Sequence, residues 1–183
     1  MREIAKPALS LVIICIVITF FVGLTYNVTK STIRERELEE LNKAMAEVLP
    51  AGSNFTNITE EMKNSLNIED TDLKLDGVYK SDAGYVFNVR VSGYGGDVAV
   101  IIGIGSDNSI SGVKLGSNKE TPSLGKRAEE PFFTSRFDGV NTGQKIETTV
   151  DTISGVTITS SAVKRAVQGA CDLYNGYGKG GGR

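Results

Sequence analysis

The segment Gly84–Leu115, with the sequence GYVFNVRVSGYGGDVAVIIGIGSDNSISGVKL, decides the fold of this 183-residue chain. In its first part, Phe87, Val89 and Val91 alternate with the side chains at positions 86, 88 and 90. Alternation with a period of two is typical of a half-buried β-strand. The later apolar runs are separated by clusters of glycine, aspartate, asparagine and serine, which form turns. The segment therefore predicts consecutive strands joined by tight turns.

The predicted sheet extends on both sides of this first strand. Gly77–Lys80 precedes it and is joined to it by the turn Ser81–Gly84. Val98–Ile104 is a continuous apolar run, and Ser109–Leu115 follows it after another turn. Three or four sequential strands with short turns indicate an antiparallel meander.

Helices are predicted before and after the strands. A polar helix over Ser31–Val48 is expected to end at Pro50–Asn54, because proline and glycine continue a helix poorly. After the strands, Thr159 and Ser160 offer N-cap hydroxyls to a final helix that carries one apolar stripe. The other expected elements are a short helix over Glu60–Leu66, a mostly helical segment over Leu124–Phe137 anchored by Phe132, Phe133 and Phe137, an extended stretch over Ile146–Val150, and a helix end at Asn175–Gly178.

The N-terminal segment carries no charge from Pro7 to Thr29 and is almost wholly apolar from Leu9 to Leu24. A helix of about 20 residues spans the hydrocarbon core, so the segment is long enough to cross a bilayer. A cleaved signal peptide is the alternative, but its apolar part is usually about 7–15 residues long and ends at a small-residue cleavage site. A buried helix in a soluble core is a third interpretation, which an apolar surface on every side disfavours.

The expected fold class is therefore α+β, an antiparallel sheet with flanking helices, preceded by one transmembrane helix. The expected organisation is a transmembrane anchor over residues 1–29, a helical stalk over 30–52, a globular domain over 53–178 and a flexible tail over 179–183. Charge does not decide the side of the membrane on which this domain lies, since basic residues flank the apolar segment at both ends.

Composition excludes several kinds of function. The net charge of −2 and the pI near 5.3 do not favour nucleic-acid binding. The chain has no histidine, which removes histidine bases and histidine haem ligands. Its two cysteines cannot by themselves form a zinc or iron–sulfur site. We therefore expect no metal centre and no catalytic residue, and an organic cofactor must carry any redox chemistry.

The stretch Asp151–Ser160, DTISGVTITS, concentrates hydroxyls around Gly155 just before a predicted helix. One interpretation is a plain strand-to-helix turn, in which Gly155 gives backbone freedom and a hydroxyl caps the helix. Thr157 precedes the expected cap, so capping does not need its hydroxyl. Lys164 and Arg165 follow in the first turns, where the helix dipole disfavours cations unless an anion such as a phosphate occupies the helix N-terminus. Both interpretations stay open on these residues alone.

Two other stretches are rich in glycine. Ser117–Lys126 contains Pro122, which fixes φ, and Gly125, which permits a close approach. It is either a polar loop that leads into a helix or a rigid loop whose backbone faces a flat ring. Gly93–Asp97 is by default a hairpin turn, and it lacks the Lys-Ser/Thr ending of a Walker phosphate loop.

The order Gly-Tyr-Gly-Gly, Glu-Thr-Pro-x-Leu-Gly, Asp-x-x-Ser-Gly-x-Thr resembles the FMN-binding domain family that includes RnfG and NqrC. The resemblance covers roughly residues 70–175, and the N-terminal apolar segment fits it. It implies that Thr157 carries FMN covalently through a phosphoester, which a separate flavin transferase installs from FAD. The FMN-binding residues that it implies are Thr157, Ser154, Gly155, Val156, Glu120, Thr121, Pro122, Leu124 and Gly125.

Three positions depart from the family pattern. Val156 replaces the usual alanine, Ser123 replaces the usual glycine, and Asn118 stands where a histidine is common. Ser123 constrains the loop if that position needs a positive φ. None of the three departures removes the hydroxyl of Thr157.

The resemblance implies an electron-relay subunit of the Rnf complex, a membrane-bound, ion-pumping ferredoxin:NAD⁺ oxidoreductase. Such a subunit is an electron carrier and not a complete enzyme. The implied partners are the other Rnf subunits, the lipid bilayer and, during maturation, the flavin transferase, with the flavin domain on the extracytoplasmic side of the cytoplasmic membrane. Two alternatives stay open: the corresponding subunit of the Na⁺-translocating NADH:quinone reductase, whose members tend to be longer, and a flavin-free anchored domain that binds a partner.

Overall fold

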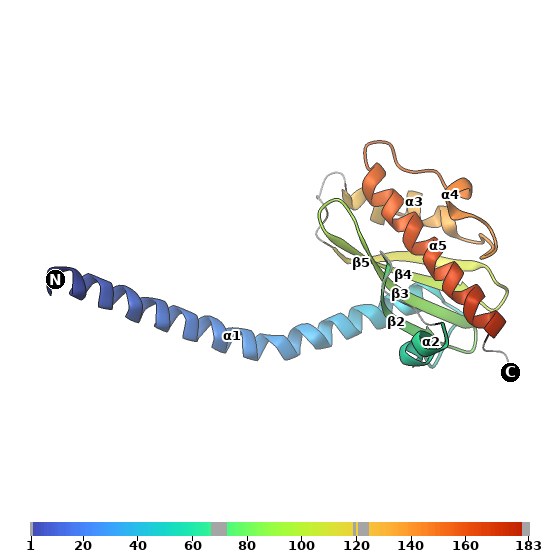
Figure 1. Ribbon diagram of the computed structural model, residues 1–183. Coiled ribbons are helices and arrows are strands. Elements are labelled where there is room, and N and C mark those ends of the chain that lie inside the picture. The colour runs from blue at the N-terminus through green and yellow to red at the C-terminus, as the bar shows by residue number, and fades with distance from the viewer. Residues whose placement is uncertain (1, 67–72, 119, 121–124, 181–183) are drawn as a thin grey trace. The chain divides into compact units, whose positions relative to one another are not determined.

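The computed structural model in Figure 1 describes residues 2–66, 73–118, 120 and 125–180. The chain divides into two compact units, Met1–Leu41 and Asn42–Arg183. Helix α1 spans Arg2–Val48. Its residues up to Leu41 belong to the first unit, and its residues from Asn42 onward belong to the second.

In the first unit, the large apolar side chains that the structure describes between Leu11 and Leu24 are 47–64% exposed. Among the described residues, no helix combines the length and the apolar character that crossing a membrane requires. The anchor over residues 1–29 therefore stays a prediction.

The second unit is built on a sheet whose described strands run in the order β1-β2-β3-β4-β5, with every neighbouring pair antiparallel. The meander that the sequence predicts is confirmed. The strands are β1 Thr56–Asn57, β2 Leu73–Lys80, β3 Gly84–Ser92, β4 Asp97–Gly105 and β5 Ile110–Asn118. Only the two-residue strand β1 has no counterpart among the predictions, because it is too short to show a period.

Helix α5, Thr157–Gly180, lies across one face of the sheet against β3 and β4 (Figure 1). Its buried stripe packs with the strand residues of that face into one core. The stripe consists of Ala162, Val163, Ala166, Val167, Ala170 and Cys171, and the strand residues include Phe87, Val89, Val98, Val100, Ile102 and Ile104. The apolar stripe that the sequence assigns to the final helix is thus the cover of the sheet.

The last turn of α1 approaches the opposite face of the sheet very closely. A Cβ on Gly103 would collide with the carbonyl oxygen of Val48, and a Cβ on Gly112 would lie 3.0 Å from the Val48 Cα. The Ser111 hydroxyl donates a hydrogen bond to the same carbonyl. Two glycines on paired strands therefore let a helix end pack directly on the backbone of the sheet.

The prediction for Ile146–Val150 needs correction. Ile146–Thr149 is the short helix α4 and not an extended stretch. Its β-branched residues favour a strand locally, but the hydroxyls of Thr148 and Thr149 both donate to the Lys145 carbonyl and hold a helical turn.

Helix α5 also continues past the predicted end at Asn175–Gly178. Its last turns are held by tertiary contacts, since a Cβ on Gly176 would lie 3.3 Å from Leu66 and the Tyr177 hydroxyl donates to Glu61 at 2.7 Å. Leu66 and Glu61 belong to α2, Thr59–Leu66, which confirms the predicted short helix.

The segment predicted as mostly helical over Leu124–Phe137 is divided into η1 Gly125–Glu129, α3 Pro131–Thr134 and η2 Ser135–Phe137. Pro131 starts a new helix because it cannot continue the previous one. Phe133 and Phe137 are buried as expected. Phe132 is 40% exposed, and the guanidinium groups of Arg127 and Arg136 each lie 5.7 Å from the centroid of its ring. The prediction that Phe132 anchors this segment is therefore wrong.

The glycine contact under α1 leads to a stability prediction. Gly103→Ala is expected to destabilise the second unit by about 1–3 kcal/mol, because the added methyl group meets backbone that cannot move aside. Gly116→Ala, where the new Cβ would lie 3.3 Å from the Ala99 methyl group, is the matched control and is expected to cost less. Urea unfolding of the two variants measures the difference. Equal destabilisation would contradict the close packing at Val48.

Candidate cofactor-attachment site

The turn before α5 exposes Thr157 while burying the apolar residues on either side of Gly155. Gly155 has a φ of 82°, a left-handed conformation that favours glycine, and a Cβ there would meet nothing within 4 Å. Ile153 and Val156 are both 5% exposed, and the Val156 N–H donates to the Ile153 carbonyl at 3.0 Å. Ser154, Gly155 and Thr157 are exposed. The apolar residues thus fix the turn, and the hydroxyl side chains face outward.

The Thr157 hydroxyl is available for chemistry. Among the described residues it has no hydrogen-bond partner. Thr157 is also the first residue of α5, so its side chain projects from the positive end of a helix of 24 residues. An exposed, unpaired hydroxyl at this position is accessible to an incoming phosphorus centre.

The two hydroxyls predicted to cap α5 have other roles, because the helix begins before them. Ser160 accepts a hydrogen bond from the Ile153 N–H at 3.2 Å and donates to the Val156 carbonyl at 2.8 Å. It therefore fastens the turn to the first turn of the helix. Thr159 donates its hydroxyl to a carboxylate that is distant in the sequence, at Glu120.

The Glu120 carboxylate joins all three motif stretches. Its Oε1 accepts hydrogen bonds from the backbone N–H groups of Tyr94 at 2.9 Å and Gly95 at 3.0 Å. Its Oε2 accepts the hydroxyl of Thr159 at 2.9 Å. Glu120 is only 5% exposed, so these three donors replace the water that a carboxylate needs.

Glycines surround this carboxylate because there is no room for side chains. A Cβ on Gly93 would collide with Oε1 of Glu120, and a Cβ on Gly125 would collide with Oε2. Gly93 also donates its N–H to Gly96 at 2.8 Å, which confirms the predicted hairpin turn. The glycines of the first and second motifs thus make space for one buried acid.

Asn118 positions Glu120 from the other side. Its Oδ1 accepts the Glu120 N–H at 3.1 Å, and its Nδ2 donates to the Gly116 carbonyl and to Glu129. The asparagine that departs from the family pattern therefore has a local structural role.

The structure brings part of the predicted site together. Glu120 and Gly125 lie beside the start of α5, next to the turn that holds Ser154, Gly155, Val156 and Thr157. Thr121, Pro122 and Leu124 lie outside the described residues. The sequence did not predict that Thr159 binds Glu120. A buried carboxylate needs hydrogen-bond donors, and the Thr159 hydroxyl is one that the motif offers.

The cations on α5 are bound to backbone carbonyls. The Lys164 ammonium donates to the Glu147 carbonyl at 3.0 Å, and the exposed Arg165 reaches the Ser92 carbonyl at 3.4 Å. Lys164 is 6% exposed, which is unusual for a lysine.

The Cys171 thiol offers no alternative chemistry. Burial, followed by the nearby charge of Asp172, raises the pKa of the Cys171 thiol to about 12, so it is not a reactive thiolate. In the described part of the chain, no group of histidine, cysteine, aspartate and glutamate residues could hold a metal ion.

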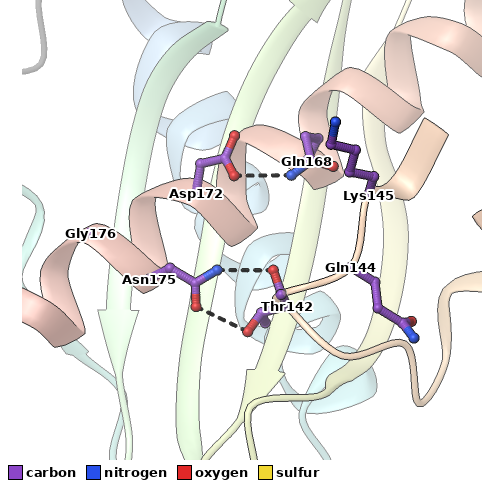
Figure 2. Close-up of a pocket in the computed structure, with 8 residues that line it drawn as sticks. Thr142, Gln144, Lys145, Gln168, Asp172, Asn175 and Gly176 are labelled. Carbon is purple, nitrogen blue, oxygen red and sulfur yellow. Dashed lines mark hydrogen bonds between the residues drawn. The ribbon is translucent and has the colours of Figure 1, made fainter. Parts of the chain in front are cut away.

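A hollow of about 480 Å³ lies along the second half of α5, away from the start of the helix (Figure 2). Its polar groups pair with one another, since Asn175 exchanges two hydrogen bonds with Thr142 and Gln168 donates to Asp172 at 3.0 Å. Gln168 also accepts the Ile146 N–H at 2.9 Å. These contacts fasten the preceding loop to α5, and we assign the hollow a structural role.

Comparison with known proteins identifies the class of this domain. Residues 93–172 match the FMN-binding domain family, and residues 1–48 match the RnfG N-terminal region. The chain is 32% identical over 187 residues to the G subunit of the ion-translocating oxidoreductase complex of Methanosarcina acetivorans, covering 95% of this chain and 96% of that protein. It is 28% identical to the G subunit of the Na⁺-translocating ferredoxin:NAD⁺ oxidoreductase complex of Acetobacterium woodii, covering 97% and 95% of the two chains.

The crystal structure of the C subunit of the Na⁺-translocating NADH-quinone reductase from Parabacteroides distasonis is similar over 56% of this chain and 61% of that one, with 27% identity and a TM-score of 0.44. The sequence matches define a protein with an FMN-binding domain. The chain belongs to the RnfG family, whose named members are G subunits of ion-translocating oxidoreductase complexes.

The Glu120 cluster leads to a second stability prediction. Glu120→Ala is expected to destabilise the domain by roughly 2–4 kcal/mol, because two backbone N–H groups and the Thr159 hydroxyl lose their buried acceptor. Glu130→Ala, which removes an exposed acid, is the control. Thermal unfolding compares them. A loss for Glu120→Ala no larger than the control would mean that the carboxylate does not hold the three motifs together.

Proposed function

We propose that this chain is an electron-relay subunit of an Rnf-type complex, and that it carries electrons on FMN attached covalently to Thr157. The observation that carries the proposal is the exposed, unpaired Thr157 hydroxyl at the start of α5, on a turn that Glu120 and Ser160 hold in place. The family of the chain supplies the cofactor class.

Attachment is a phosphoryl-group transfer to the hydroxyl of Thr157. Its oxygen forms a bond to the FMN phosphorus of FAD, the bond between that phosphorus and the bridging oxygen breaks, and AMP leaves. The hydroxyl proton is lost, and no electrons are transferred. A flavin transferase is the proposed catalyst, since the chain has no histidine to act as a base beside Thr157.

The residues around Thr157 fit a phosphoester. A Cβ on Gly155, two residues before Thr157, would meet nothing within 4 Å, and the helix N-terminus favours a negative charge. FMN supplies reversible electron uptake and release, which no side chain of this composition provides. The chain itself then has to bind and orient the flavin. For this role we propose the residues that the resemblance implies, namely Thr157, Ser154, Gly155, Val156, Glu120, Thr121, Pro122, Leu124 and Gly125.

The named relatives support a place in a larger assembly. The relatives from M. acetivorans and A. woodii are subunits of ion-translocating oxidoreductase complexes, and this chain spans nearly their whole length. We propose the other Rnf subunits as its partners. The corresponding subunit of the quinone reductase is the alternative, and the subunits that copurify with the chain distinguish the two.

We also propose that residues 1–29 anchor the chain in the cytoplasmic membrane in a single pass, with the flavin domain on the extracytoplasmic side. The support is the uncharged segment Pro7–Thr29 and the exposed apolar side chains between Leu11 and Leu24. Apolar surface of this extent is costly in water and stable in lipid.

The attachment site is tested on denatured protein. After coexpression with a flavin transferase, the wild-type chain is expected to give a fluorescent band under ultraviolet light in a denaturing gel. Thr157→Ala is expected to lose the band, because the phosphoester oxygen is gone. Thr152→Ala, at an exposed threonine of the same turn, is the matched control and should keep it. A dark wild-type band would refute covalent flavin, and a bright Thr157→Ala band would move the site elsewhere.

The anchor is tested by fractionation. The full chain is expected to stay in the membrane pellet after alkaline carbonate washing, and a chain without residues 1–29 is expected to be released. The mass of the purified full chain reports whether the N-terminal segment is retained. A full chain in the soluble fraction would contradict the anchor, and a shortened mass would indicate a cleaved signal peptide.

A further inference from the structure

Two buried charges flank the start of α5. Among the described residues, the charged side chains that are buried are Glu120 and Lys164. Glu120 accepts three hydrogen bonds, whereas the Lys164 ammonium donates to a single neutral group, the Glu147 carbonyl, at 3.0 Å. Within the described part of the chain, no carboxylate lies within ion-pair distance of Lys164. A buried cation without a counter-ion is costly, so its presence needs an explanation.

Helix geometry places Lys164 on the same side of α5 as Thr157. The two residues are seven apart, close to two full turns, so their side chains leave the helix in nearly the same direction. Their Cα atoms are separated along the axis by about 10.5 Å. Side chains on a helix lean toward its N-terminus, so a lysine side chain at position 164 is long enough to cover much of this separation.

The two threonines at the start of the helix face different sides. Thr159 is about 200° around the helix from Thr157, and its hydroxyl reaches Glu120. Thr157 therefore projects away from the buried Glu120 and toward the side of the helix that carries Lys164. A phosphate on Thr157 would lie away from the negative charge of Glu120 and on the same side as the positive charge of Lys164.

Three contacts fasten residues 142–149 to this side of α5. The loop and helix over residues 142–149 run along it, with Asn175 bound to Thr142, Gln168 to Ile146 and Lys164 to Glu147 (Figure 2 shows the first of these contacts). Lys164 is the last of these three contacts before the exposed Thr157. The ammonium has three N–H donors, of which Glu147 takes one.

We propose that Lys164 is the cation that binds the phosphodiester joining Thr157 to FMN. This proposal rests on the proposed attachment at Thr157. The phosphodiester carries one negative charge, and two N–H donors of Lys164 remain for its oxygens. The charge of Lys164 is then uncompensated before flavin attachment and compensated afterwards. The helix N-terminus adds to the same anion site.

A purely structural role for Lys164 makes a different prediction. As a support for α4 through the Glu147 carbonyl, Lys164 would stabilise the chain equally with and without flavin. As a phosphate ligand without its phosphate, it is a buried charge whose removal costs nothing or stabilises. The two roles therefore predict opposite signs for the change in stability that removal of Lys164 causes before flavin attachment.

The test compares melting temperatures of the full chain, before and after flavin attachment, for wild type, Lys164→Met and Lys145→Met. Lys145 is exposed and loses the same charge, so it is the matched control. Without flavin, Lys164→Met is expected to melt at or above wild type. Flavin attachment is expected to raise the melting temperature of wild type and of Lys145→Met by at least about 4 °C more than that of Lys164→Met. Lys164→Arg, which keeps the charge, is expected to recover most of the larger rise.

The outcomes distinguish the attachment of FMN at Thr157 from the binding of its phosphate by Lys164. A wild-type chain that takes up no flavin refutes the attachment at Thr157. Flavin attachment with the same rise in wild type and Lys164→Met refutes the role of Lys164 alone. A Lys164→Met chain that melts well below wild type before attachment, or does not fold, also overturns it, because Lys164 is then structural. The ³¹P resonance of the attached flavin provides an independent readout, and it is expected to shift in Lys164→Met and not in Lys145→Met.

Discussion

The buried carboxylate of Glu120 is the interaction on which the arrangement of the site depends. It accepts two backbone N–H groups from the β3–β4 hairpin and one hydroxyl from α5, so a single side chain holds three distant segments together. The glycines at 93 and 125 are required because the same carboxylate occupies their side-chain space. The resemblance implies that Glu120 contacts FMN, and that contact stays a prediction; within the protein both carboxylate oxygens accept hydrogen bonds. Its role in the structure is to fix the start of α5 and hence the position of Thr157.

This arrangement separates the charges around α5. The acid lies on the side of Thr159 and the buried lysine on the side of Thr157, so the proposed phosphoester would form where the local field favours an anion. The sheet and the last turn of α1 provide the rigid base beneath, because Gly103 and Gly112 allow Val48 to pack on the strand backbone. A covalent cofactor placed on such a base does not need a deep pocket to retain it.

Local patterns predicted the elements that local physics determines. The period-two alternation around Phe87 and the turn residues between strands are read directly from the chain, and the meander follows. The sequence did not predict α4, since Ile146 and its threonines favour a strand until the Lys145 carbonyl binds two hydroxyls. It did not predict the partner of Thr159 either, because that contact spans 39 residues and requires Glu120 to be buried. Tertiary contacts of this kind leave no periodic signal.

Covalent attachment of FMN to Thr157 is tested most directly by mass spectrometry of the chain purified from cells that contain a flavin transferase. Trypsin cleavage after Lys145 and Lys164 releases one peptide, Ile146–Lys164, that contains Thr157. This peptide is expected to carry the mass of FMN less one water, and fragmentation is expected to place the modification on Thr157. An unmodified peptide from a chain that holds flavin elsewhere, or a modification on Ser154 or Thr159, would contradict it.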